Sequence, residues 1–359
     1  MSGVFDGLPD QPEARRLLEA ALARPSHAYL LSGPEGSCKR DYADRFAAAL
    51  LDADPARVAG RTHPDLFVLE PEGAGILMDD ARRLRRDLHL RPFEAARRVY
   101  LILDAHLLRD DGANALLKSL EEPPAYGVFV LVSDHAGRML PTILSRVATV
   151  PFRPFPAAVL AERTGDPVAA RVAMGSLRRA ERLAADPEAA ERRRIYLAVA
   201  GASRRDPAFD AAGAAAQILE AANRCGREEG TRVAAELDAL LLSVDDERER
   251  RALTKRFEER AKRAARRAEW DELRLAVDTI GLWYRDALAG GLGAQDVMLD
   301  SAGYGEPPDD AMEGGVEATL EALSVVLDVR RSLELNVHPA LALEALLTRL
   351  AAAPAAVGA

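Results

Sequence analysis

The chain has 359 residues, too many for one ordinary hydrophobic core, so two or three domains are expected. Its formal net charge of −9 argues against nonspecific nucleic-acid binding by the whole surface, although not against a local basic patch. Because Cys38 and Cys225 are its only cysteines, a disulfide framework and a four-cysteine zinc site are excluded. We find neither a leader sequence nor an apolar run of membrane-spanning length, so we expect a cytoplasmic protein without membrane contact.

A glycine-rich turn follows the first predicted strand. Residues 28–31 are an apolar run typical of a buried strand, and apolar residues recur at helical spacing over 41–51. Between them, Gly33 and Lys39 fit the phosphate-binding pattern G-x-x-x-x-G-K-[ST]. The strand, turn and helix are the context that such a loop needs, and a chance match in an unrelated turn is the alternative.

Two positions of this loop depart from the pattern. Cys38 stands where a second glycine would let backbone N–H groups close around a phosphate, and its side chain would enter that space. Arg40 replaces the hydroxyl residue that ordinarily holds Mg²⁺, and a guanidinium has no acceptor atom for a cation. We therefore predict that ATP binding is lost or weak.

A third catalytic part is absent further along the chain. The apolar run 99–103 predicts a strand that is followed by Asp104, in the place where a carboxylate helps to hold Mg²⁺. Working sites continue with a glutamate that orients the attacking water, but here Ala105 follows and cannot accept a proton. The plainer role that we predict for Asp104 is to cap the next helix.

Four motifs follow one another along the chain: HPDL at 63–66, Asp104-Ala105, NALLKSLEEPP at 114–124 and LPTILSR at 140–146. In these motifs the chain resembles the delta-prime subunits of the bacterial DNA polymerase III clamp loader, a family of AAA+ proteins. The resemblance implies a P-loop domain whose parallel sheet has helices on both faces, which agrees with the alternation of predicted strands and helices. The motor subunits of the same loader, gamma and tau, keep a complete loop and an Asp-Glu pair, and this chain has neither.

The resemblance also singles out Arg146. The Ser-Arg-Cys motif of the family reads Ser145-Arg146-Val147 here, with the first two residues intact. In the family this arginine reaches the ATP of the neighbouring subunit, where a guanidinium stabilises charge that develops in the transition state. The resemblance therefore implies that Arg146, with Ser145 beside it, acts in trans as an arginine finger. A surface arginine or a structural ion pair is the alternative.

Unlike many members of the family, this chain is not expected to bind zinc. Many of the family's members bind zinc through four cysteines between the first helix and the HPD motif. Residues 52–62 of this chain contain no cysteine, so we predict that it holds no zinc.

The predicted fold is α/β plus all-α. Its expected parts are an AAA+ P-loop-like domain at 1–155, a small helical lid at 156–205, a helical collar at 206–354 and a tail at 355–359. The collar would hold the subunits of the ring together. Its WYRD stretch is similar to the family pattern, and we predict Trp283 and Arg285 at a subunit interface.

Residues 260–267 form a basic cluster without an acidic member. Binding of DNA or of a partner is one interpretation of this cluster. A solvated helix face is the other, and charge runs usually mean that.

The resemblance implies a non-catalytic, stator-like subunit of the replicative clamp loader. Its partners would be the gamma/tau and delta subunits in a hetero-oligomeric ring, the sliding clamp, and primed DNA contacted through the complex. By itself the chain would not be an enzyme, only a component of the DNA polymerase III holoenzyme. Two alternatives stay open. Tight Mg²⁺-ATP binding would favour an active motor-type ATPase, and salt-dependent duplex binding would favour a stand-alone DNA-binding protein.

Overall fold

The structure is a computed structural model that describes residues 3–70, 83–84, 86–88, 90–108, 110–241, 247–294, 298, 315–333 and 337–352. The chain divides into two compact units, Met1–Arg182 and Leu183–Ala359. This division falls inside the segment 156–205 that the sequence assigns to a lid, and the division into three domains stays a prediction. The expected tail at 355–359 lies outside the described residues.

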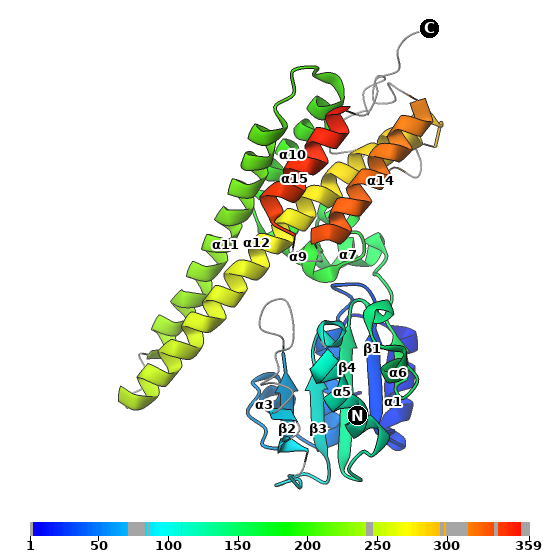
Figure 1. Ribbon diagram of the computed structural model, residues 1–359. Coiled ribbons are helices and arrows are strands. Elements are labelled where there is room, and N and C mark those ends of the chain that lie inside the picture. The colour runs from blue at the N-terminus through cyan, green and yellow to red at the C-terminus, as the bar shows by residue number, and fades with distance from the viewer. Residues whose placement is uncertain are drawn as a thin grey trace. The chain divides into compact units, whose positions relative to one another are not determined.

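A five-stranded sheet forms the centre of the first unit, in the order β2-β3-β4-β1-β5, and every pairing is parallel (Figure 1). The predicted parallel sheet is confirmed, and the strands predicted at 28–31 and 99–103 are both present. Their bounds are Ala28–Ser32 for β1, Leu66–Leu69 for β2, Arg98–Ile102 for β3, Gly127–Ser133 for β4 and Ala148–Pro151 for β5.

Helices cover both faces of this sheet because both faces are apolar. Alternate strand residues such as Leu31, Leu101 and Val130 pack with α1 (Pro12–Ala23), α2 (Lys39–Leu51) and α3 (Pro55–Ala59). The residues between them, such as Leu30 and Ile102, pack on the other face with α5 (Asp110–Glu121) and α6 (Pro141–Leu144). The three central strands, β3, β4 and β1, are therefore buried on both faces, whereas the edge strand β5 is partly exposed.

Three short helices complete the first unit, and they are α7 (Ala157–Thr164), α8 (Pro167–Val172) and α9 (Leu177–Ala185), which runs across the unit boundary. They attach to the glycine-rich turn, because the Leu177 N–H donates to the Gly36 carbonyl at 3.0 Å. Gly36 has φ +76°, and a Cβ there would lie 1.9 Å from Ser176 Oγ, so this position requires glycine.

In its described residues, all the regular secondary structure of the second unit is helical. Its helices are α10 (Ala189–Arg205), α11 (Ala211–Leu241), α12 (Glu247–Gly291), α14 (Gly315–Leu333) and α15 (Pro339–Ala352). They share one large apolar core. The helical character predicted for this part of the chain is confirmed. Within the described residues, no helix has the length and apolar character that crossing a membrane requires.

The two longest helices, α11 and α12, form an antiparallel hairpin that extends past the other helices of the second unit (Figure 1). The 45 residues of α12 span about 67 Å at about 1.5 Å per residue. In the extended part, Val233, Leu237 and Phe257 form a small apolar cluster that holds the two helices together.

Candidate functional site

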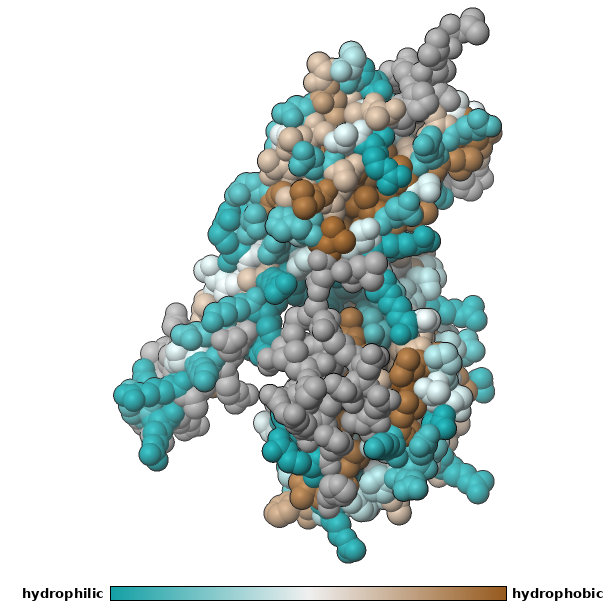
Figure 2. All heavy atoms as spheres, in the orientation of Figure 1, coloured by the Kyte–Doolittle hydropathy of each residue, from teal (hydrophilic) through white to brown (hydrophobic). Residues whose placement is uncertain are grey.

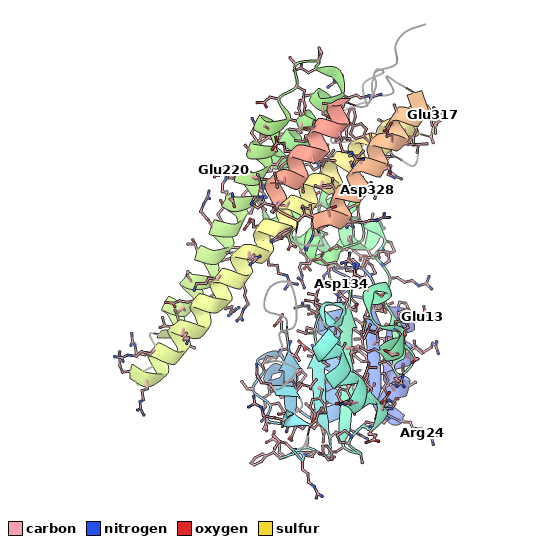
Figure 3. The ribbon with its side chains drawn as sticks, in the orientation of Figure 1. Glu13, Arg24, Asp134, Glu220, Glu317 and Asp328 are labelled. Carbon is pink, nitrogen blue, oxygen red and sulfur yellow. The ribbon has the colours of Figure 1, made fainter. Side chains whose placement is uncertain are left out.

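The candidate nucleotide site lies where three neighbouring strands end. The glycine-rich turn follows β1, Asp104 follows β3 and Asp134 follows β4. Because β3, β4 and β1 are adjacent and parallel, their carboxyl ends meet at one edge of the sheet, where α/β proteins bind ligands. Asp134 is labelled at this edge in Figure 3.

Lys39 is bound by groups of its own chain. Its ammonium, 3 % exposed, lies 2.7 Å from an oxygen of Asp134. It also donates to the Pro34 carbonyl and, at 3.1 Å, to Ser37 Oγ. Since an ammonium has three N–H donors, these three partners account for all of them. Burial lowers the pKa of Lys39, and the Asp134 carboxylate opposes that shift.

Arg40 makes the second internal ion pair of this site. Its Nη2 lies 2.6 Å from Asp104 Oδ2, and its Nη1 lies 2.9 Å from Glu70 Oε1. Burial acts to lower the pKa of Arg40, but the carboxylates of Asp104 and Glu70 outweigh it and the pKa is raised. The guanidinium that replaces the loop hydroxyl therefore contacts the carboxylate that follows β3.

These pairs also balance the charge at the start of α2. Lys39 and Arg40 are its first two residues, and cations are unfavourable at a helix N-terminus because the helix dipole is positive there. Asp104 and Asp134 approach from the ends of β3 and β4 and supply the negative charge that this terminus favours.

The capping role predicted for Asp104 is wrong. Asp104 does precede a short helix, η1 (Ala105–Leu107), but its side chain makes no capping hydrogen bond. Its carboxylate accepts from Arg40 instead, because the end of β3 and the start of α2 lie at the same edge of the sheet. The next residue, Ala105, is buried and has no carboxylate.

Cys38 takes the conformation of a glycine. It has φ 63°, in the left-handed region, immediately before α2. Its side chain packs against two apolar clusters, one beneath α2 and one formed by α7 to α9. Burial raises the pKa of this thiol to about 12, so it stays neutral at ordinary pH. Gly33 fits closely as well, since a Cβ there would lie 2.3 Å from the Phe152 carbonyl oxygen.

Arg146 lies at the surface just after α6. Its Nη1 donates to the Thr142 carbonyl at 2.9 Å and to Ser145 Oγ at 3.2 Å. Its Nη2 lies 2.9 Å from Glu121 Oε1 at the end of α5, in an ion pair that is open to solvent. Ser145 donates in turn to the Thr142 carbonyl at 3.0 Å. The guanidinium is thus presented outward and held by weak, exposed contacts.

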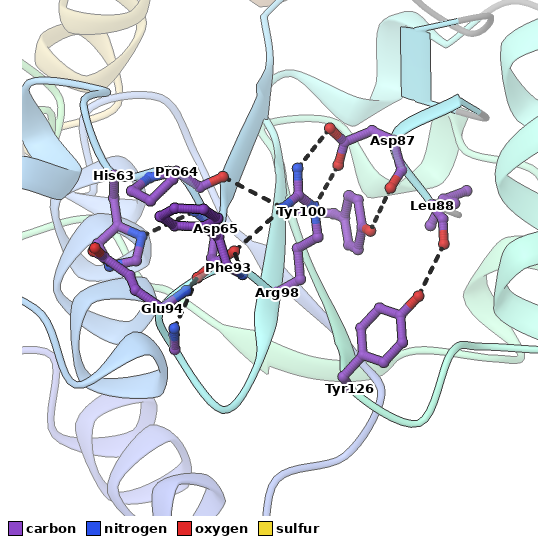
Figure 4. A network of polar contacts seen from close by, with 11 residues as sticks. His63, Pro64, Asp65, Asp87, Leu88, Phe93, Glu94, Arg98, Tyr100 and Tyr126 are labelled. Carbon is purple, nitrogen blue, oxygen red and sulfur yellow. Dashed lines mark hydrogen bonds and ion pairs between the residues drawn. The ribbon is translucent and has the colours of Figure 1, made fainter. Parts of the chain in front are cut away.

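The HPDL motif has a structural role that the sequence did not reveal. Asp65 is fully buried and accepts hydrogen bonds from the backbone N–H groups of Phe93, Glu94 and Ala95 (Figure 4). Arg98 lies 3.3 Å from Asp65 and 2.6 Å from Asp87, which joins the segment before β3 to the same network.

This anchored segment carries an exposed apolar side chain. Phe93, whose N–H donates to Asp65 at 2.6 Å, is 83 % exposed, and Leu90 nearby is 53 % exposed. The motif therefore fixes the backbone of a segment whose aromatic side chain is left in solvent.

The interface role predicted for Trp283 needs correction. Trp283 is only 6 % exposed, packs in the core of the second unit and makes an edge contact with Tyr284. Its side chain therefore stabilises this unit rather than forming an exposed anchor. Arg285 is more accessible and lies 2.8 Å from Asp286, and its interface role stays a prediction.

Asp134 was missed by the sequence reasoning, although a signal for it exists. Its position after β4 matches that of Asp104 after β3, since each closely follows an apolar run of at least four residues. Asp134 follows β4, which pairs with β1, and Asp104 follows β3, which is one strand further away, so both carboxylates end near the loop that follows β1. The strand order supplies that information, and the motifs alone did not.

A family model described as "DNA polymerase III, delta subunit" matches residues 11–156. DNA polymerase III subunit delta' of Pseudomonas aeruginosa is 43 % identical over 138 residues, which cover 34 % of this chain and 42 % of that protein. The resemblance to the delta-prime family is confirmed. The matched residues contain the whole sheet and the candidate site, so the delta-prime likeness covers both.

Other relatives are also DNA polymerase III subunits, some of them delta' and others gamma/tau. DNA polymerase III subunit delta' of Bacillus subtilis is 32 % identical over 166 residues, which cover 43 % of this chain and 50 % of that protein. DNA polymerase III subunit gamma/tau of Mycobacterium tuberculosis is 35 % identical over 149 residues, which cover 37 % of this chain and 25 % of that protein. The chain thus spans half or less of the length of these relatives.

A solved structure of a gamma subunit-related protein from Thermotoga maritima aligns with 95 % of this chain and 99 % of that one. Its sequence identity is 18 % and its TM-score 0.48, a similarity that carries no argument about the site.

Proposed function

We propose that the chain is a non-catalytic, stator-like subunit of the replicative clamp loader that lends Arg146 to an adjacent ATPase subunit. The observation that carries this proposal is the internal pairing of Lys39 with Asp134 and of Arg40 with Asp104. The two loop cations that would face a nucleotide are each bound to a carboxylate of the same chain. The likeness of residues 11–156 to delta-prime subunits supports the same function.

The residues of the site do not fit a magnesium–nucleotide complex. Lys39 has its three donors engaged, and Asp104, which would help to hold Mg²⁺, is paired with Arg40. No hydroxyl follows the lysine, and Ala105 cannot orient a water. We therefore infer a degenerate site at which ATP binding is lost or weak, so that the chain by itself is not an ATPase.

The place of Arg146 suits an action in trans. A finger must leave its own subunit to stabilise charge on a phosphate held by a neighbour, and such arginines contribute roughly 10³–10⁵ in rate. Arg146 lies at the surface, and each of its contacts is exposed. Little free energy opposes its release, because exposed ion pairs are worth about 0–1 kcal/mol. Ser145 would position the guanidinium through its hydroxyl oxygen.

We assign the collar role to the second unit. Figure 2 shows hydrophobic side chains gathered over its helical bundle, whereas the end of the hairpin is hydrophilic. Leu320 and Leu327 of α14 and Leu341 of α15 are each more than half exposed. Apolar side chains of this size on neighbouring helices suit contacts with other subunits of a hetero-oligomeric ring. In this proposal those subunits are gamma/tau and delta, and Arg285 contributes to the interface.

The loader role also implies contact with the sliding clamp, and with primed DNA through the complex. Phe93 is suited to a protein contact, since it is an exposed aromatic side chain on a backbone fixed by Asp65. Aromatic anchors on rigid segments lose little conformational freedom on binding. In this proposal the protein acts in the cytoplasm and holds no zinc.

Calorimetry and ATPase assays test this function together. We expect no heat when the purified chain is titrated with Mg²⁺-ATP. In a loader reconstituted with the motor subunits, Arg146→Ala should lower the ATPase rate. Arg153→Ala is the matched control, because it removes another exposed, ion-paired arginine of the same unit. Micromolar Mg²⁺-ATP binding by the chain alone would instead favour a motor-type subunit, and an unchanged rate with Arg146→Ala would refute the finger.

A further inference from the structure

Helix α12 carries a basic face made of Arg260, Lys262, Arg263, Arg266 and Arg267, all of them exposed. At about 100° per residue, these five side chains fall within about 160° of the helix circumference. No acidic residue occurs between the first and the last of them. Arg260 lies 3.1 Å from Glu236 of α11 and stacks over the Phe257 ring, which places it at one end of the face.

The opposite face of the same turns is made of alanines and is bound to α11. A Cβ on Gly226 would lie 2.9 Å from the Ala265 carbonyl oxygen, and a Cβ on Gly230 would lie 3.2 Å from the Ala265 Cβ. The two helices therefore approach closely where small residues meet. This contact fixes the rotation of α12 about its own axis and keeps the cations directed toward solvent.

A hollow of about 500 Å³, open to solvent, adjoins this face. It is lined by Lys262, Ala265, Arg266, Glu269, Trp270 and Pro339. Trp270 is half-buried, since part of its ring packs against the core of the second unit. The hollow thus combines two exposed cations, the carboxylate of Glu269 and an indole ring that packs against the core.

We propose that the basic face binds single-stranded nucleic acid, with the phosphates along the five cations and an unpaired base in the hollow beside Trp270. Cations along a backbone track and an aromatic ring for stacking are the two parts that single-strand sites combine. The cationic stretch is about 10 Å long at about 1.5 Å per residue, enough to contact more than one phosphate of a strand. A base that stacks on Trp270 must be unpaired, which favours a single strand over a duplex. The site lies within the second unit and does not depend on the proposed role in ATP hydrolysis.

Fluorescence titration of the full chain with a dT oligomer tests this site at two salt concentrations. We expect binding at low salt that weakens as salt rises, and quenching of Trp270, since the other tryptophan, Trp283, is buried. The variant Arg263→Ala/Arg266→Ala/Arg267→Ala should weaken binding at least tenfold. It should also reduce the salt slope by about 2, given about 0.7 per phosphate contact on a single strand.

Two further variants separate the parts of the site. Trp270→Phe keeps an aromatic ring against the core and should abolish the quenching while most of the affinity remains. Arg227→Ala/Arg251→Ala removes exposed arginines outside the face and should leave binding unchanged. Wild-type protein that fails to bind the oligomer at low salt, or a triple variant that binds as tightly as this control, overturns the proposal. Tighter binding of a duplex than of the single strand overturns it as well.

Discussion

Arg40 and Asp104 lie 64 residues apart in the sequence, and their side chains meet at 2.6 Å in the candidate site. Arg40 occupies the loop position that ordinarily supplies a hydroxyl to Mg²⁺, and Asp104 occupies the strand-end position that ordinarily helps to hold the same ion. An internal cation therefore contacts the carboxylate in place of a metal. Losing the hydroxyl did not leave the aspartate without a partner, because the replacement residue carries the compensating charge.

The first prediction concerns the strength of this pair. In a double-mutant cycle of Arg40→Ala and Asp104→Ala, we expect a coupling free energy of about 1 kcal/mol, since charged hydrogen bonds are strong but both partners are partly solvated. Denaturant unfolding of the four proteins measures it. The exposed pair of Arg153 and Glu13 is the matched control, and its cycle should give a value near zero. Equal couplings in both cycles would show that the Arg40 pair contributes no more than a surface ion pair.

The second prediction is that nucleotide binding can be restored in part. Arg40→Thr removes the guanidinium and supplies a hydroxyl, and Cys38→Gly gives the left-handed position the residue it favours. We expect the double variant to bind Mg²⁺-ATP with a Kd below about 1 mM, measured by calorimetry. Arg40→Lys, which keeps a cation beside Asp104, is the control and should gain nothing. Comparable binding by both variants would mean that the cation is not what blocks the site.

The sheet was predictable because most of its strands are apolar runs, and the resemblance carried by the motifs implied that the strands are parallel. The partner of Arg40 was not predictable, because it depends on the order of the strands in the sheet, which decides which carboxylates lie near the loop. Trp283 was misjudged for a related reason. The stretch around it is apolar on several sides of α12, and only the packing of the other helices decides that Trp283 faces the core. A single sequence does not reveal which side chains of distant segments contact one another.

The third prediction concerns Asp65. Burial would raise its pKa, but the N–H groups of residues 93–95 and Arg98 more than offset this, and the pKa lies below its usual range. A depressed pKa contributes stability above about pH 4, and this stability is lost as pH falls through the folded-state value. Asp65→Asn weakens the hydrogen bonds from residues 93–95 and removes one of the two carboxylates beside Arg98, which stays paired with Asp87, so it should destabilise the protein by about 2 kcal/mol at pH 7. The variant should also lose less stability than the wild type between pH 4 and pH 2, as urea unfolding at each pH would reveal.

The fourth prediction concerns the two thiols. Burial raises the pKa of both Cys38 and Cys225 to about 12. At pH 8 the thiolate fraction of each should be about a thousandfold below that of an ordinary cysteine, and the thiolate is the reactive form. We expect the folded protein to react far more slowly with a disulfide reagent than the protein unfolded in urea. In the variant Cys225→Ser, the only thiol left to react with the reagent is that of Cys38. A fast reaction of this folded variant would contradict the burial of the Cys38 thiol.

The last prediction concerns the ion pair of Glu121 and Arg146, and it rests on the proposed finger. The Arg146 side chain is 35 % exposed and that of Glu121 50 %, so the pair holds the finger by no more than about 1 kcal/mol. Glu121→Gln should therefore release Arg146 at little cost and leave the fold unchanged. In the reconstituted loader we expect a steady-state ATPase rate between the wild-type value and about five times that value. Glu122→Gln makes the same charge change one residue away and is the matched control. If Glu121→Gln lowered the rate as Arg146→Ala is expected to, Glu121 would be a positioning residue that orients the finger rather than a contact from which the finger is released.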